Sequence, residues 1–245
     1  MRMLLGFLVF FFGASLSGAI VAVSGADELD RVLGAWITQN VTFEKDRENR
    51  EILFVRKRTV RAYISSDDPE IVADARSSVA NLADAFGLKH EFGSTGVNMI
   101  VATANRVTDD KGHPDKVLLR SLGLTESAAD YISADVKSWS TGCGFYVSRD
   151  DDGRLSFSIA VAEKTLPTKK KLQACIVTGV IFSFGLRIGN GTILESSNDY
   201  VQFLLVARAM SDCEKKVGGQ NSQTVPTRDI YVQCIQSELK AKLVK

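Results

Sequence analysis

Histidine, the side chain most often used for acid–base chemistry and metal binding near neutral pH, occurs at only two positions, His90 and His113. A catalytic zinc site normally needs a close pair of ligands, as in H-E-x-x-H on a helix, and neither histidine belongs to such a pair. His90 follows the end of a predicted helix and His113 precedes Pro114 in a predicted loop. Both are therefore interpreted as surface residues, and the sequence predicts no metal ligand.

Serine chemistry is not indicated either. A nucleophile elbow has the pattern G-x-S-x-G, and the nearest segment, Ser183-Phe184-Gly185, has Ile181 in place of the first glycine. That segment also lies inside an apolar stretch with helical character. The sequence therefore predicts no catalytic residue.

Two loops have the composition of cofactor sites without the required pattern. The run Asp150-Asp151-Asp152-Gly153 partly matches a calcium loop, but Ile159 occupies the position where a bidentate glutamate is needed. The run Gly189-Asn190-Gly191-Thr192 lacks the third glycine of a dinucleotide loop and follows a helix rather than a strand. Both are interpreted as turns, and no cofactor is predicted.

The cysteines are even in number and widely spaced: Cys143, Cys175, Cys213 and Cys234. No C-x-x-C motif is present, which disfavours a metal cluster or a redox pair and favours structural disulfides. Four cysteines allow three pairings. The sequential one closes two loops of moderate length, each of which would stabilise the fold by roughly 3–4 kcal/mol.

The first 26 residues have the layout of an export signal. A short positive start, Met1-Arg2-Met3, precedes an almost wholly apolar run over residues 4–23, and small residues follow at Ser24-Gly25-Ala26. We expect cleavage after Ala26, with Ala19 as a second candidate, and a periplasmic or secreted protein. The alternative is an uncleaved membrane anchor over residues 4–23, since about 20 apolar residues can cross a bilayer.

The remaining chain mixes helical and strand patterns. Apolar residues recur at helical spacing, often behind a capping residue, and alternate with polar residues in the strands. The predicted helices cover residues 27–41, 69–86, 114–122, 125–137, 169–184, 196–210 and 227–239, and the predicted strands cover 52–64, 97–102, 144–148 and 155–162. The last two strands form a predicted hairpin across an Asp-Gly turn.

These elements do not alternate regularly, which favours an α+β fold: a small mixed or antiparallel sheet packed with several helices and stabilised by disulfides. We predict a main α+β domain over residues 27–215 and a C-terminal helical extension over residues 216–245.

The charge is balanced, with 30 Lys and Arg against 29 Asp and Glu, so nucleic acid is not a predicted partner. Two basic clusters, Arg56-Lys57-Arg58 and Lys169-Lys170-Lys171, are interpreted as solvated faces. The alternative is that either cluster binds an acidic partner or a cell-surface polyanion.

From Cys143 onward the chain resembles an uncharacterised domain family of bacterial exported proteins. The resemblance rests on a cysteine before a hairpin, Cys175-Ile176 in a helix that ends at Gly185-Leu186, and a helix around Asp199 with Leu204-Leu205. It is clearest over residues 143–205. The layout of the Cys175 helix is similar to the active helix of zincin-type metallopeptidases, so the resemblance implies a zincin-like fold, an exported protein and a Cys143–Cys175 disulfide.

The expected chemistry follows from the positions at which this chain differs from that family. Its helix usually carries two acidic residues and then a glutamine, whereas this chain has Thr178, Gly179 and Phe182 at those positions. None of these can ligate zinc or activate a water molecule. The resemblance therefore argues against peptidase activity.

The sequence thus predicts an exported, non-catalytic domain that acts through contacts with a protein or envelope partner of unknown identity. A degenerate zincin-type hydrolase is the alternative. Contact with a membrane is expected only if the N-terminal segment is retained.

Overall fold

The computed structural model describes residues 8–10, 20–22, 26–45, 51–56, 59–111, 113–124, 142–151, 153–188, 194, 197–218 and 228–243. Its centre is a five-stranded sheet in the order β6-β5-β7-β9-β8. The strands are β5 (Val60–Ser65), β6 (His90–Phe92), β7 (Met99–Thr103), β8 (Cys143–Arg149) and β9 (Leu155–Ala162). The first four in spatial order are parallel, and only β8 is antiparallel to its neighbour β9. The predicted mixed sheet is confirmed, and the antiparallel alternative is wrong.

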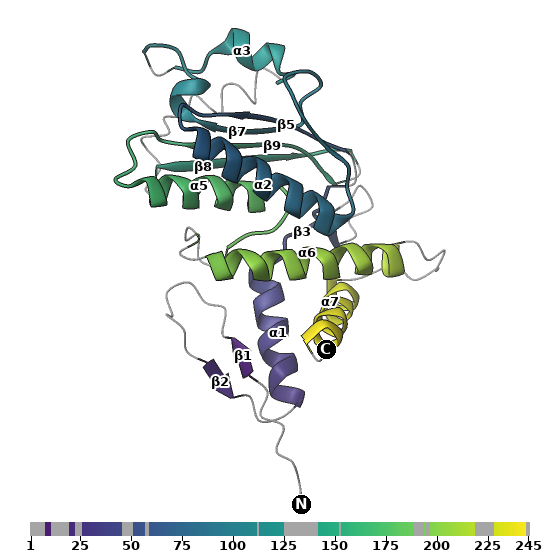
Figure 1. Cartoon of the computed structure of the whole chain (residues 1–245). Coiled ribbons are helices and arrows are strands. Elements are labelled where there is room, and N and C mark those ends of the chain that lie inside the picture. The colour runs from purple at the N-terminus through teal and green to yellow at the C-terminus, as the bar shows by residue number, and fades with distance from the viewer. Residues whose placement is uncertain are drawn as a thin grey trace, which may run out of the picture.

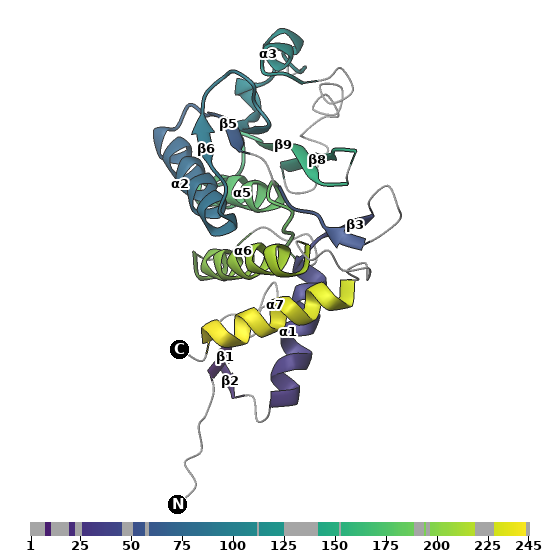
Figure 2. The same cartoon turned by 90° about the vertical axis from the view of Figure 1, so that its right-hand side faces the viewer.

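The helices lie mainly on one face of this sheet (Figure 1). Helices α2 (Pro69–Phe86) and α5 (Lys169–Phe182) lie side by side against it, and α6 (Ser197–Gly218) crosses beneath them. Helices α1 (Ala26–Asn40) and α7 (Arg228–Leu243) pack farther from the sheet, as the second view confirms (Figure 2). On the opposite face lie the short α3 (Lys116–Ser121) and the 3-10 turn η1 (Ala104–Arg106).

Two short ribbons complete the described elements. Strands β1 (Leu8–Phe10) and β2 (Ile20–Ala22) pair antiparallel, as do β3 (Phe43–Lys45) and β4 (Glu51–Leu53). Of the rest of the predicted signal segment, only Ala26, the first residue of α1, is among the described residues. Within the described part of the chain, no helix combines the length and the hydropathy needed to cross a membrane.

The best-predicted helix is α2. Asp68 caps it by accepting a hydrogen bond from the Glu70 amide (2.9 Å), Pro69 opens it, and Gly87 ends it in a left-handed conformation. The hairpin β8–β9 is confirmed as well. The predicted helix over residues 125–137 lies outside the described residues.

The predicted strand over residues 52–64 is wrong as a single element. Residues 51–53 form β4 in the outer ribbon, and β5 of the main sheet begins only at Val60. Between them Phe54, Val55 and Arg56 are all buried, so the chain passes through the core instead of continuing as a strand.

The disulfides follow the sequential pairing. Cys143 at the start of β8 is bonded to Cys175 in α5, with Cα atoms 5.7 Å apart. Cys213 in α6 is bonded to Cys234 in α7, with Cα atoms 5.9 Å apart. Each bond joins two packed elements, and α6 itself runs to Gly218, through the position at which the C-terminal extension was predicted to begin.

A continuous apolar core links the sheet to the outer helices. It extends from the sheet through α2, α5 and α6 to α1 and α7. The outermost contributors are Leu33, Trp36 and Ile37 of α1 and Tyr231, Ile235 and Leu239 of α7. Beside Tyr231, the Arg154 guanidinium after the hairpin turn pairs with Glu214 of α6 at 2.9 Å. Helix α7 therefore belongs to the same packed unit as the sheet.

Arg56 is the most deeply buried described cation, with 4% of its surface exposed. Its Nε donates to the Ser183 carbonyl (2.6 Å), and its terminal nitrogens donate to the carbonyls of Asn98 (3.0 Å) and Ser156 (3.3 Å) and to the Ser158 hydroxyl. Burial lowers the pKa of Arg56 to about 9, which leaves the side chain charged at neutral pH. Four oxygen atoms thus take the place of water around the charge.

Gly185 fixes the exit from α5. Its φ is +83°, and a Cβ atom built there would lie 1.6 Å from the carbonyl oxygen of Phe54. The residue therefore needs both the conformational freedom of glycine and the absence of a side chain. This close approach seats the buried 54–56 segment against the end of α5.

Replacing Gly185 by Ala is expected to lower the free energy of unfolding by about 3 kcal/mol or more, because the new methyl group must displace the backbone of Phe54. Urea unfolding followed by circular dichroism would measure the loss. Gly93 is the matched control, since nothing lies within 4 Å of a Cβ built there, and Gly93→Ala should change stability by less than about 0.5 kcal/mol. Equal effects would contradict the packing described.

Replacing Arg56 by Met is expected to cost about 3 kcal/mol or more, because it leaves several buried oxygen acceptors without a donor. The control is Arg61→Met, which removes a guanidinium from β5 that is 53% exposed and pairs with Glu91 at 3.5 Å. That change should have an effect within about 0.5 kcal/mol, as usual for an exposed ion pair. The same unfolding measurement applies, and similar losses for the two variants would count against a central role for Arg56.

Candidate ligand site at the carboxyl ends of the parallel strands

The order of the strands places a topological switch point between β5 and β7, where the chain connections run to opposite sides of the sheet. From β5 the chain leaves through α2 and returns as β6 on one side, whereas after β7 it leads to β8 and β9 on the other side. The loops that follow β5 and β7 therefore diverge at the carboxyl edge of the sheet. In open α/β sheets this point forms the crevice in which ligands usually bind.

A cavity of about 260 Å³ lies at this edge. Its lining comes from the loop after β5, the last residue of β7, the link from β9 into α5 and the start of α5 itself. The residues are Ser66, Asp67, Asp68, Thr103, Lys164, Leu166, Thr168, Lys169 and Leu172. The volume suits one small group rather than a large cofactor.

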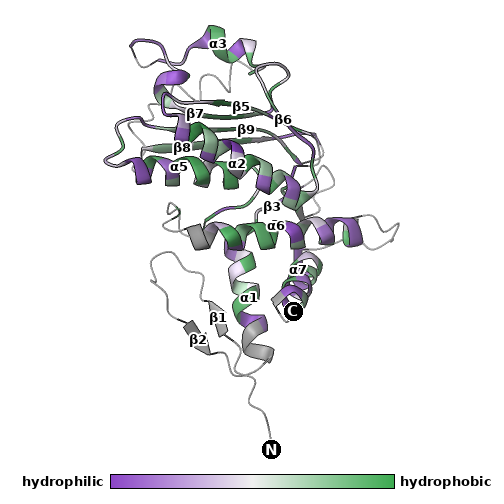
Figure 3. Cartoon of the chain, viewed as in Figure 1, coloured by the Kyte–Doolittle hydropathy of each residue, from purple (hydrophilic) through white to green (hydrophobic). Residues whose placement is uncertain are grey.

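Two helices begin at the cavity. Asp68 is the N-cap of the 18-residue α2, and Thr168 is the N-cap of the 14-residue α5, where its hydroxyl accepts from the Lys171 amide at 3.2 Å. The first turn of α5 is hydrophilic and the rest is mostly hydrophobic (Figure 3). Because a helix carries partial positive charge at its N-terminus, both helices make the potential at the cavity more positive.

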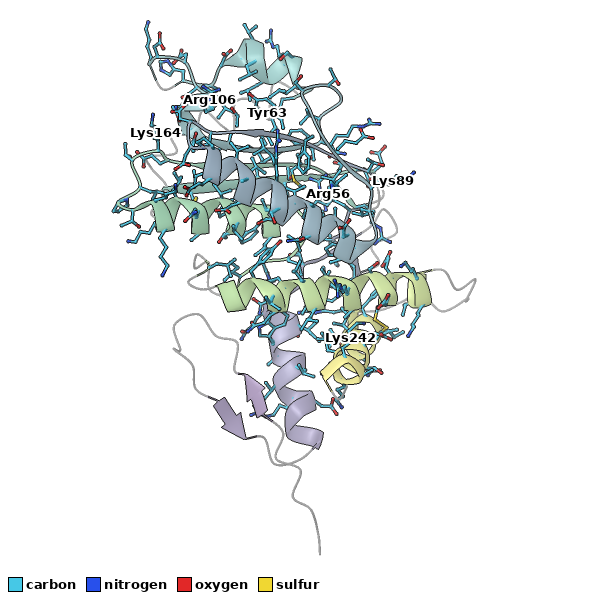
Figure 4. The ribbon with its side chains drawn as sticks, in the orientation of Figure 1. Arg56, Tyr63, Lys89, Arg106, Lys164 and Lys242 are labelled. Carbon is cyan, nitrogen blue, oxygen red and sulfur yellow. A yellow bond between two sulfur atoms is a disulfide. The ribbon has the colours of Figure 1, made fainter. Side chains whose placement is uncertain are left out.

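Asp67 is the centre of one charged network at the rim. Its Oδ2 accepts from Lys164 Nζ and from Asn105 Nδ2, both at 2.7 Å, and its Oδ1 lies 3.4 Å from an Arg106 nitrogen. Arg106 also donates from Nε to the Ser65 hydroxyl at 3.1 Å. Arg106 and Lys164 lie together at this end of the sheet, and Arg56 lies toward the other end (Figure 4). The Lys164 hydrogen bond, helped by that from Asn105, lowers the pKa of Asp67.

Asp68 and Lys169 form a second network beside the first. Lys169 Nζ lies 2.9 Å from Asp68 Oδ2 and also pairs with Glu70. The hydrogen bond from Lys169 lowers the pKa of Asp68, and the Glu70 and Asp68 carboxylates raise the pKa of Lys169. Each network thus fixes the position of one lysine ammonium group at the rim of the cavity.

Thr103 differs from these exposed groups. It is 2% exposed, and its Oγ1 has no hydrogen-bond partner among the described residues. Met99 and Val101 pack in the core on the α2 and α5 side of the sheet, and alternation along β7 turns Thr103 to the same side, where it lines the cavity. A buried hydroxyl without a partner costs about 1–3 kcal/mol, and the Thr103 hydroxyl beside the cavity is such a group.

The histidines singled out in the sequence do not meet. His90 lies 3.7 Å from Asp84 and His113 lies 3.6 Å from Asp109, in separate parts of the fold. Within the described ranges, no group of three or more His, Cys, Asp or Glu residues is placed to hold a metal ion. Asp150 accepts from the Arg154 amide and helps to form the β8–β9 turn.

The structure places the two basic clusters in different environments. Arg56 is buried, so its interpretation as part of a solvated face is wrong; its neighbours Lys57 and Arg58 lie outside the described residues. In the second cluster Lys169 to Lys171 are all exposed, but only Lys169 also lines the cavity.

The sequence did not single out Asp67, Thr103 or Lys164. The available signal was a polar run just after each of two predicted strands, Ser66-Asp67-Asp68 and Asn105-Arg106.

Comparison of the chain with protein-family models, with curated proteins and with solved structures finds no match. The resemblance to an exported domain family therefore stays a prediction, and the geometry of the carboxyl edge is the basis for the function proposed below.

Replacing Lys164 by Met is expected to raise the pKa of Asp67 toward the ordinary aspartate value of about 3.9, because the strongest donor to its carboxylate is lost. In the native protein the stabilisation from Asp67 is present above that unfolded-state value and is lost as the pH falls through its lowered folded-state pKa. An acid titration of the Asp67 carboxyl carbon by NMR would measure the shift. Lys170→Met removes an exposed lysine outside the cavity lining and should leave Asp67 unchanged. An unaltered Asp67 pKa in Lys164→Met would refute the network.

Proposed function

We propose that this chain is an exported, non-catalytic domain that acts by binding, and that it meets its protein or envelope partner at the carboxyl-edge cavity. One observation carries the proposal. Two helix N-termini, two oriented lysines and a buried hydroxyl without a partner surround one small cavity at the topological switch point of the sheet. Such convergence of polar groups on one concave space is typical of a binding site.

The charged groups at the cavity favour binding over catalysis. A general base works best when its pKa lies near the operating pH. The pKa values of Asp67 and Asp68 are instead lowered by their lysine partners, so both carboxylates are weak bases. Lys169 has its pKa raised, which makes it a poor nucleophile at neutral pH.

The packing around α5 also favours a non-catalytic role over a zincin-type hydrolase. A Cβ at Gly179 would lie 2.4 Å from the Cβ of Ala160, and Phe182 stacks on Phe145 with ring centroids 5.1 Å apart. The Thr178 hydroxyl accepts from the Leu194 amide at 3.1 Å in a buried position. Of the two helix positions that carry acidic groups in the resembling family, Gly179 packs against β8 and β9 and Thr178 is hydrogen-bonded to Leu194.

The two disulfides suggest an oxidising, extracytoplasmic environment. Together with the signal-like first 26 residues, they support export to the periplasm or secretion. Retention of the N-terminal segment as an anchor would instead make the protein a membrane-tethered subunit, and carbonate extraction of membranes separates these two forms.

Affinity capture after crosslinking in the native envelope tests the proposal. Full-length protein should retain a partner in stoichiometric amount, and Lys169→Glu should reduce its recovery at least about tenfold, because reversing a charge at the cavity repels what the lysine attracts. Lys170→Glu makes the same change of charge one residue away, outside the cavity lining, and should retain the partner.

Recovery of the same partner with all three proteins would contradict a role for the cavity. Stoichiometric zinc in the purified protein, lost on replacing His90 or His113, would favour the hydrolase alternative over the proposed function.

A further inference from the structure

The hydrogen-bonding capacity of the cavity is mostly on the donor side. Asp67 accepts from Lys164, Asn105 and Arg106, and Asp68 accepts from Lys169 and from the Glu70 amide. Their oxygen atoms are thus already engaged by the protein. An ammonium group has three N–H donors, and among the described residues Lys164 uses one on Asp67 while Lys169 pairs with Asp68 and Glu70. A ligand that supplies hydrogen-bond acceptors would fit the N–H donors of the lysines that these pairs do not use.

Binding such a ligand does not require the existing ion pairs to break. The spare N–H groups belong to the same ammonium groups whose positions Asp67 and Asp68 already fix. Thr103 lines the same space, and its buried hydroxyl lacks a partner among the described residues. The lysines, the hydroxyl and the positive ends of α2 and α5 therefore favour an oxyanion.

The surroundings limit the charge and shape of that oxyanion. Asp67, Asp68 and Glu70 already pair with Lys164, Lys169 and Arg106, so these side-chain charges cancel. The three carboxylates would therefore repel a dianionic phosphate more strongly than a singly charged carboxylate. The side chains of Leu166 and Leu172 give the cavity an apolar wall. Its volume of about 260 Å³ admits a short chain.

We propose that the cavity binds a carboxylate attached to a short aliphatic group, with the carboxylate at Thr103, Lys164 and Lys169 and the aliphatic part against Leu166 and Leu172. The inference rests on the proposed binding function and names its ligand chemistry. Two sources share this chemistry: a free short-chain acid and the carboxyl terminus of a peptide that ends in an aliphatic residue.

Calorimetry and amide-resolved NMR on the purified, disulfide-bonded protein test the inference with defined probes. Hexanoate, or acetyl-alanyl-leucine with a free carboxylate, should bind and shift the amide signals of Ser66, Thr103 and Lys169. Hexylammonium, inorganic phosphate and the amidated dipeptide should bind at least about tenfold more weakly, because each lacks the single carboxylate. Preference for hexanoate identifies a free acid, and preference for the dipeptide identifies a peptide terminus.

Variants locate the site. Lys164→Met, Lys169→Met and Thr103→Val should each raise the Kd about tenfold or more, since each removes a hydrogen bond to a charged group. Thr103→Ser keeps the hydroxyl and should bind like the native protein. Lys170→Met removes the same charge as Lys169→Met from outside the lining and should also bind normally.

Three results would overturn the inference: tighter binding of phosphate or hexylammonium than of either carboxylate, equal losses in Lys169→Met and Lys170→Met, or no binding of either carboxylate. If both carboxylates fail while capture from the envelope still depends on Lys169, the ligand chemistry is wrong and the binding function stands. If capture is also independent of Lys169, both proposals fail.

Discussion

The buried guanidinium of Arg56 is the interaction on which the arrangement of this fold depends. Its acceptors come from the end of α5, from the residue before β7 and from the first half of β9. All of them lie at the amino edge of the parallel strands. A charge at this depth is tolerated only if its donors are satisfied. The backbone at Arg56 must therefore lie within reach of these acceptors. The carbonyl at the carboxyl end of α5 also complements a positive charge.

Anchoring one end of α5 determines where the other end lies. The helix runs antiparallel to β9, from which it follows, so fixing its carboxyl end at the amino edge brings Thr168 and Lys169 to the opposite edge. The Cys143–Cys175 bond holds the middle of the same helix to β8, and Gly179 allows close packing on Ala160. The cavity is therefore positioned by interactions that lie outside it, as expected for a site built on rigid elements.

How far the sequence predicts this molecule depends on how local each signal is. The cap at Asp68, the stop at Gly87 and the turn before Arg154 act over a few residues, and the elements they define were predicted correctly. The strand over residues 52–64 failed because Arg56 resembles a surface residue until its acceptors, which are 42 to 127 positions away, are known. The site was missed for the same reason: Asp67, Thr103 and Lys164 become neighbours only once β5, β7 and β9 are known to be parallel and adjacent.

The two edges of the sheet differ in whether their buried polar groups have hydrogen-bond partners. At the amino edge the buried guanidinium of Arg56 uses four of its five N–H donors on protein oxygen atoms. At the carboxyl edge the ion pairs are exposed, each is worth little to stability, and the buried hydroxyl of Thr103 stays without a partner. If the carboxyl edge served stability alone, an apolar residue at position 103 would be the better choice, since it removes the cost of an unpaired hydroxyl. A ligand of the kind proposed above, bound in the cavity, would account for a threonine at this position.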